Sequence, residues 1–136
     1  MIFKPQFRYI WAVALIVYCG FIYYLSDQSR WIIPVPDLFD MQDKLIHATA
    51  YAVMAFLFWQ SGRCWMIFYG KMQWHALAVT CVLFCALYGL SDEWHQSFVA
   101  GRDASFFDWM ADALGALLLT IMLIKREFTL SRASSN

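Results

Sequence analysis

Four long apolar runs dominate this chain of 136 residues and restrict what it can fold into. They extend over residues 9–25, 45–59, 74–90 and 106–124. A membrane-spanning helix needs about 20 mostly apolar residues, with about 17 as the short limit. Three runs meet that length directly, and the second reaches it if its helix extends over residues 43–61. Hydrophobic residues make up 62% of the chain and charged residues 15%, a composition too apolar for a soluble domain of this size.

We therefore predict an all-α protein, an integral membrane four-helix bundle that forms a single domain over residues 1–136. The helices are expected at about residues 9–25, 43–61, 74–97 and 105–124, followed by a polar, frayed tail over residues 125–136. For the first run a cleavable signal peptide is the alternative, because Lys4 and Arg8 precede it. Its apolar core is longer than that of a usual signal and no Ala-x-Ala site follows, which favours a retained helix.

The basic residues predict the orientation of the bundle. Of the ten, seven fall on the side of the N-terminus: Lys4, Arg8, Arg63, Lys71, Lys125, Arg126 and Arg132. Arg30, Lys44 and Arg102 fall on the opposite side, so the positive-inside rule predicts that both termini are cytoplasmic. Nine of the ten acidic residues then lie outside, which makes the outer face electronegative. All seven tryptophans lie near expected helix ends or in loops, as expected of residues at the membrane interface.

Polar side chains gather at the expected outer ends of the second, third and fourth helices. On the second helix Asp43, His47 and Tyr51 are spaced four residues apart, so they share one face, with Lys44 beside them. Ionisable groups are costly near hydrocarbon and are retained where they are paired, hydrated or used. This end of the bundle is therefore the predicted functional region.

The run from Ser91 to Gln96 carries the most concentrated polar signal. It contains Asp92 and Glu93, and Asp92 shares a helical face with Gln96. Arg102 follows in the short connection, where its planar guanidinium can bridge carboxylates or bind a phosphate.

On the last helix, Asp108 and Asp112 lie one turn apart on the same face. Ala111 with Gly115, and Asp112 with Ala116, give small-xxx-small spacings that let a neighbouring helix approach closely. The aspartates are therefore expected to face the bundle. We predict that the polar groups of the three helices and Arg102 converge on one hydrated pocket open to the outside.

Two motifs in this order carry a resemblance. Asp43-Lys44-x-x-His47-x-x-x-Tyr51 is followed by Asp92-Glu93-x-x-Gln96-x-x-x-x-Gly101-Arg102-x-x-x-x-x-Asp108 and by a last helix that contains glycine. The pattern resembles the VanZ-like family, small bacterial membrane proteins named for a teicoplanin-resistance accessory, over roughly residues 9–124. Ala100 stands where the family usually has Pro, and Asp112 where it usually has Asn. The resemblance implies a multi-pass protein of the bacterial cytoplasmic (inner) membrane, but no established reaction.

The leading functional hypothesis is a pocket for the head group of an amphiphilic cell-envelope lipid or lipoglycopeptide, linked to envelope function or to glycopeptide (teicoplanin) resistance. The expected ligand-binding residues are Asp43, Lys44, His47, Tyr51, Asp92, Glu93, Gln96, Arg102, Asp108 and Asp112. The expected partners are the lipid bilayer and an anionic or lipid-linked envelope ligand. Nucleic acid is not an expected partner, and the oligomeric state is left open.

Three alternatives remain. The first is a membrane enzyme that performs acid–base chemistry on a lipid phosphate or glycolipid, with His47, Glu93 and Asp108 as catalytic candidates. The second is a structural or partner-binding protein whose polar network holds the helices in register. The third and least favoured is transport, because no inverted repeat is visible.

Neither a cofactor nor a metal is predicted. The chain has no nucleophile elbow, P-loop or recognisable cofactor motif. His47, Glu93 and His95 are zinc or manganese ligands by type, but no paired-ligand motif such as His-x-x-x-His accompanies them.

Overall fold

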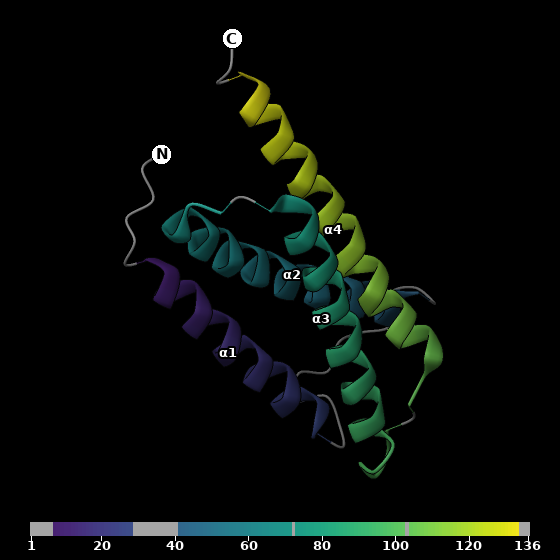
Figure 1. Cartoon of the computed structure of the whole chain (residues 1–136). Helices are drawn as coiled ribbons and strands as arrows, with labels where there is room; N and C mark the ends of the chain where they lie inside the picture. Colours follow the sequence, from purple (N-terminus) through teal and green to yellow (C-terminus); the bar gives the residue numbers. More distant parts are fainter. Residues whose placement is uncertain (1–6, 29–40, 72, 103, 134–136) are drawn as a thin grey trace.

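The computed structural model describes residues 7–28, 41–71, 73–102 and 104–133, which contain four helices and no strand. The helices are α1 (Phe7–Ser26), α2 (Gln42–Tyr69), α3 (Trp74–Gln96) and α4 (Phe106–Ala133) (Figure 1). Three of them, α1, α3 and α4, are long and apolar enough to cross a membrane. The prediction of an all-α membrane bundle is confirmed.

α2 is the central helix of the bundle. It contacts each of the other three helices and packs most extensively against α4. Within the described parts of the chain, α1 packs on α2 and α3 and makes no close contact with α4. α1 begins and α4 ends at the same end of the bundle, here called the Arg63 end (Figure 1). The opposite end, where α3 connects to α4, is called the Arg102 end. Which end faces the cytoplasm stays a prediction.

α2 is longer than predicted. We expected it to end near Ser61 and to be followed by a connection from Gly62 to Gln73, but the helix continues to Tyr69. Gly62 lies inside the helix, where a Cβ atom would lie 2.3 Å from Cδ1 of Leu77, so glycine here lets α3 pack closely. Gly70 ends the helix with a left-handed φ of 66°, and its N–H donates to the carbonyl of Ile67.

α4 also extends further than predicted. The expected frayed tail from residue 125 is helical as far as Ala133, so that prediction was wrong for the described part of the tail. The reason lies in an ion pair between helices: Nε of Arg63 is 2.8 Å from Oε1 of Glu127. Glu127 is only 7% exposed, so the polar end of α4 packs on α2 and does not lie free in solvent.

The apolar core fills the middle of the bundle. Its buried members are Ile22, Tyr51, Met54, Ala55, Cys81, Cys85 and Ala116. Trp59 is fully buried and stacks on Trp74, with 6.1 Å between ring centroids. The prediction that every tryptophan lies at a helix end was therefore wrong for Trp59, because the extension of α2 moves this residue toward the middle of its helix.

Polar side chains of the bundle donate to the backbone carbonyls of neighbouring helices. The Tyr88 hydroxyl on α3 donates to the carbonyl of Cys19 on α1 at 2.7 Å. The Trp109 indole on α4 donates to the carbonyl of Ala86 on α3 at 2.9 Å. These bonds satisfy donors that have little access to water, and each joins two helices at a defined height.

α2 and α4 approach each other most closely at Gly115. A Cβ atom on Gly115 would lie 2.0 Å from the carbonyl oxygen of Ala48, so only glycine allows this contact. The prediction that the small residues of the last helix admit a neighbour is confirmed, and the neighbour is α2. This contact fixes how the polar first turns of the two helices face each other.

Candidate functional site

The predicted polar residues of α3 and α4 are buried at the Arg102 end. Asp92, Glu93, Gln96 and Asp108 are 3–6% exposed, and Asp112 is fully buried. The prediction that the aspartates of the last helix face the bundle is confirmed. Four of these side chains are carboxylic acids, so the site must supply positive charge or protons to balance them.

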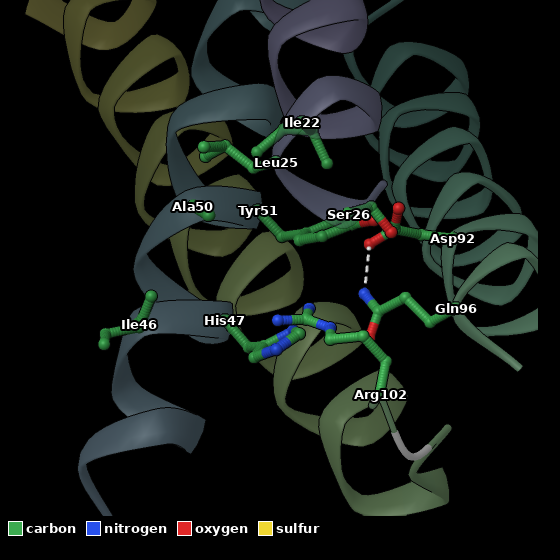
Figure 2. A pocket seen from close by; sticks show the side chains of 10 residues that line it. All are labelled: Ile22, Leu25, Ser26, Ile46, His47, Ala50, Tyr51, Asp92, Gln96 and Arg102. Atoms are coloured by element: carbon green, nitrogen blue, oxygen red, sulfur yellow. Dashed lines mark hydrogen bonds between the residues drawn. The ribbon is translucent and has the colours of Figure 1, made fainter. Parts of the chain in front are cut away.

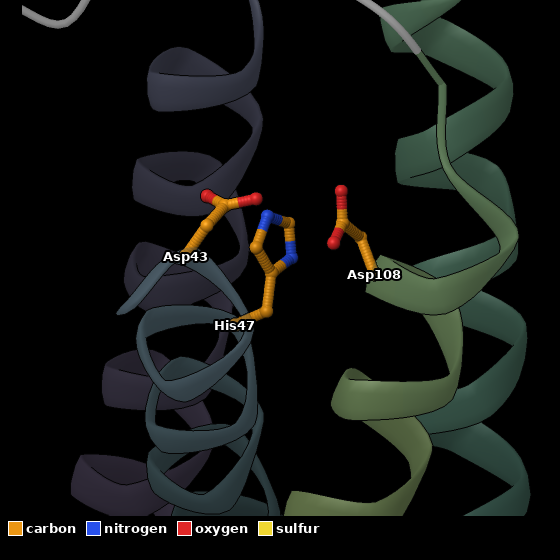
Figure 3. Close-up of side chains that lie close together, drawn as sticks. All are labelled: Asp43, His47 and Asp108. Atoms are coloured by element: carbon orange, nitrogen blue, oxygen red, sulfur yellow. The ribbon is translucent and has the colours of Figure 1, made fainter. Parts of the chain in front are cut away.

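Lys44 supplies one of the positive charges. Its ammonium group donates to Oδ1 of Asp108 and, at 3.2 Å, to Oδ2 of Asp43. Asp43 is half exposed at the rim, whereas the side chain of Asp108 is 9% exposed. Figure 3 shows the His47 ring between these two carboxylates. The first turn of α2 is thereby joined to the first turn of α4.

His47 lies one turn deeper and pairs with Asp112. Its Nδ1 atom is 3.0 Å from Oδ1 of Asp112, and the two side chains are 11% and 0% exposed. Gly89 on α3 makes room for this carboxylate, since a Cβ atom there would lie 3.0 Å from Oδ2 of Asp112.

Glu93 joins α3 to the beginning of α4. Its Oε2 atom accepts a hydrogen bond of 2.7 Å from the backbone N–H of Ser105. The carbonyl of Ser105 in turn accepts from the N–H groups of Asp108 and Trp109, at the start of α4. Sequence reasoning missed Ser105, although a serine just before a helical run is a usual sign of a helix start. The second oxygen, Oε1 of Glu93, is buried and has no hydrogen-bond partner within the described segments.

Gly101 places Arg102 in the site. Its φ of 80° is left-handed, a conformation that glycine adopts without the steric cost of a side chain. The turn closes with a 3.1 Å hydrogen bond from the N–H of Arg102 to the carbonyl of Val99. Figure 2 shows the Arg102 side chain pointing toward His47.

A small cavity, about 60 Å³ in volume, opens beside Arg102. It is lined by Ile22, Leu25, Ser26, Ile46, His47, Ala50, Tyr51, Asp92, Gln96 and Arg102 (Figure 2). The amide of Gln96 donates to Oδ2 of Asp92 at 3.2 Å, which orders one polar wall. Ser26, at the end of α1, was missed by sequence reasoning, although a polar residue that ends an apolar run is a usable signal. The cavity is therefore amphipathic.

The structure divides the predicted residues into two groups that share His47. The cavity is lined by His47 together with Tyr51, Asp92, Gln96 and Arg102. The second group, here called the carboxylate group, does not line this cavity and contains Asp43, Lys44, Glu93, Asp108 and Asp112. Whether any of these residues binds a ligand stays a prediction.

His95 takes no part in either group. Its Nε2 atom lies 3.2 Å from Oδ1 of Asp27, and its ring lies 4.6 Å from the ring of Tyr23. Both partners belong to α1 or the residue that follows it, so His95 faces away from Glu93. His95 therefore lies apart from His47 and Glu93.

Comparison with models of known protein families shows to which family this chain belongs. A model of the VanZ/LLP1 family matches residues 2–128, a range that includes α1, α2 and α3 and most of α4. The chain belongs to the VanZ/LLP1 family. The family resemblance seen in the two polar motifs is thereby confirmed, and with the membrane-length helices it indicates a multi-pass membrane protein. Comparisons of this VanZ/LLP1 chain with curated proteins and with solved structures return no match.

Proposed function

We propose that this VanZ/LLP1 protein binds the anionic head group of an amphiphilic cell-envelope molecule, a lipid-linked precursor or a lipoglycopeptide, in the cavity beside Arg102. One observation carries the proposal: the same cavity combines an apolar wall with a polar wall that contains Arg102. The apolar wall consists of Ile22, Leu25, Ile46 and Ala50. An amphiphile whose tail lies along the helices can then place its head group against the polar wall.

The polar wall suits a head group that carries both negative charge and hydrogen-bond donors. The Arg102 guanidinium offers planar paired donors for a phosphate or carboxylate. Asp92, held by Gln96, offers acceptors for the hydroxyl or amide groups of a sugar or peptide. The positive-inside rule would place this end at the outer face of the cytoplasmic membrane, where envelope precursors and glycopeptide antibiotics are met. A role in envelope function or teicoplanin resistance would follow from binding there.

The test uses the full chain in mild detergent and measures binding of three probes: a polyprenyl phosphate, the uncharged polyprenol, and teicoplanin. Native mass spectrometry and fluorescence titration are expected to show binding of the phosphate and the lipoglycopeptide, and weaker binding of the polyprenol. Arg102→Ala should weaken phosphate binding by about 10–100-fold, since a charge-assisted hydrogen bond contributes roughly 1.5–3 kcal/mol. Arg126→Ala is the matched control, because it removes an exposed arginine near the Arg63 end.

Equal affinity of wild type, Arg102→Ala and Arg126→Ala for every probe would contradict the proposal. If Arg102→Ala instead loses thermal stability in proportion to binding, the polar network is structural, as in the structural or partner-binding alternative. Melting of each variant in the absence of probe separates these two outcomes.

Acid–base catalysis on a lipid phosphate or glycolipid is the second candidate. The observation that favours it is the position of His47, which lines the cavity while its Nδ1 atom contacts Asp112. A carboxylate that orients a histidine beside a substrate pocket is a common arrangement for a general base. Release of phosphate from the polyprenyl phosphate, abolished by His47→Gln in a folded protein, would support catalysis over simple binding.

A further inference from the structure

We propose that His47, Glu93 and Asp112 hold a divalent metal ion with a preference for nitrogen and oxygen ligands, such as Zn²⁺ or Mn²⁺. These three residues are called the buried triad. The proposal goes beyond head-group binding and does not depend on it, because Glu93 and Asp112 do not line the cavity. Imidazole and carboxylate together are ligand types that suit zinc and manganese.

The first argument is convergence. One ligand atom from each member of the buried triad lies within 4.8 Å of the other two. The three residues come from α2, α3 and α4, so the bundle itself brings them together. Ligands bound at 2.0–2.2 Å to one ion lie about 3–4 Å from each other, so small side-chain rotations would close the set around an ion.

The second argument is that the triad contains buried oxygen atoms to which no described residue donates a hydrogen bond. Oε1 of Glu93 and Oδ2 of Asp112 are each buried and accept no hydrogen bond from any described residue. Glu93 is 6% exposed and Asp112 is fully buried. A carboxylate oxygen in such surroundings costs free energy unless a cation or a donor reaches it. A metal ion supplies this positive charge without needing more protein donors.

The third argument is the balance of charge. The Lys44 ammonium forms ion pairs with Asp43 and Asp108, and Arg102 lines the cavity together with Asp92. Of the two triad carboxylates, Asp112 pairs with the His47 imidazole and Glu93 accepts a hydrogen bond from a backbone N–H. With a neutral His47 the triad carries two negative charges, which one divalent ion balances.

A neighbouring set, Asp43, His47 and Asp108, also converges within 4.8 Å (Figure 3). It is the weaker candidate, because the Lys44 ammonium already bonds to both of its carboxylates. Asp43 is also half exposed, so its charge is well hydrated. Asp112, by contrast, is fully buried, and its Oδ2 atom accepts no hydrogen bond from any described residue.

The ion would leave the triad with at least one open coordination position, as in sites that have three protein ligands. Water or an oxygen atom of a bound molecule would fill it. Because His47 also lines the cavity, an ion in the triad would add positive charge next to the proposed head-group site.

The experiment measures metal directly in the full-length protein, purified in mild detergent through a tag that does not bind metals. After treatment with chelator, the protein is loaded with Zn²⁺, Mn²⁺ or Co²⁺, and bound metal is counted by mass spectrometry. We expect about one ion per folded chain, with visible absorption bands from the Co²⁺ form. Glu93→Gln and Asp112→Asn should weaken binding by about 100-fold or more, beyond the 10–100-fold typical for loss of an outer-shell partner.

Asp43→Asn is the matched control, because it removes a carboxylate from the neighbouring set and leaves the buried triad intact. It should bind metal as the wild type does. Wild-type protein that stays folded and binds none of the three ions would overturn the proposal, and so would loss of binding in Asp43→Asn with retention in Asp112→Asn. If a triad variant fails to fold, the proposal is tested on the wild-type protein alone. Added metal should then raise the melting temperature of the wild type. Since the readout is metal content, failure here leaves lipid binding at Arg102 untouched.

Discussion

Nδ1 of His47 lies 3.0 Å from Oδ1 of Asp112, and this contact joins α2 to α4 in the interior of the bundle. Substituting His47 and substituting Asp112 should lower the stability of the bundle by unequal amounts. In metal-free protein His47→Ala leaves a fully buried carboxylate without this partner, and breaking a buried pair in this way costs about 3–5 kcal/mol. Asp112→Asn keeps a hydrogen-bonding oxygen and removes the buried charge, so it should melt close to wild type.

Thermal melting followed by tryptophan fluorescence, in the presence of chelator, measures both variants. The double variant His47→Ala/Asp112→Asn is the control, and it should recover much of the stability lost in His47→Ala. A melting temperature of His47→Ala equal to that of the wild type would show that the pair contributes nothing to stability.

α2 and α4 both continue beyond their apolar runs, and the Arg63–Glu127 ion pair explains this. Single and double substitutions test this pair, as they test the pair of His47 and Asp112. Glu127→Ala leaves Arg63, whose side chain is 17% exposed, without its 2.8 Å partner and should destabilise the bundle by about 3–5 kcal/mol. Replacing both residues, as Arg63→Met/Glu127→Leu, should restore stability. A double-mutant cycle by thermal melting measures the coupling, and a coupling energy of zero would disprove the role assigned to this pair.

The approach of α2 to α4 depends on Gly115. Gly115→Ala places a methyl group where the backbone oxygen of Ala48 stands, 2.0 Å away, so the helices must separate. Overpacking of this kind costs about 1–3 kcal/mol or more. Gly20→Ala is the matched control, because nothing lies within 4 Å of its added Cβ. The melting temperature should fall for Gly115→Ala only, and a fall of equal size in both variants would contradict the close-packing argument.

Substitution of Gly101 by alanine should weaken binding at the head-group site, and substitution of Gly70 should not, although both glycines have left-handed φ angles. Alanine at either position costs about 1–2 kcal/mol of backbone strain. At Gly101 the strain also displaces Arg102, so we expect Gly101→Ala to weaken binding of polyprenyl phosphate by about 10-fold, or roughly 1.4 kcal/mol. Titration of both variants with the same lipid tests this, and equal affinities would show that the Gly101 turn does not position Arg102.

Much of the site was visible in the sequence because helical periodicity decides which residues share a face. The four-residue spacing of Asp108 and Asp112 predicted that both face the bundle, and both are buried. The small residue Gly115 predicted the close approach of a neighbouring helix. In each case the information is local, since it depends only on 3.6 residues per turn and on side-chain size.

The division of the polar residues into two groups was not visible in the sequence. One hydrated pocket was expected, but Arg102 and Asp92 line a cavity, whereas Glu93 and Asp112 do not line it and converge with His47. Which carboxylate meets which cation depends on the rotation and height of one helix relative to another. Those quantities follow from packing contacts far apart in the chain, such as Gly115 on Ala48, and no local pattern encodes them.

By itself the sequence determined the helical, membrane-spanning class, the family pattern and the polar faces, because each follows from hydrophobicity, spacing and residue type along one segment. Only the tertiary structure decided where α2 and α4 end and which ionisable groups meet. Charged residues such as Arg63 and Glu127 argue against a continuing buried helix when each is considered alone. They become compatible with it once the fold places them 2.8 Å apart, because a paired charge loses less free energy on burial than a single one.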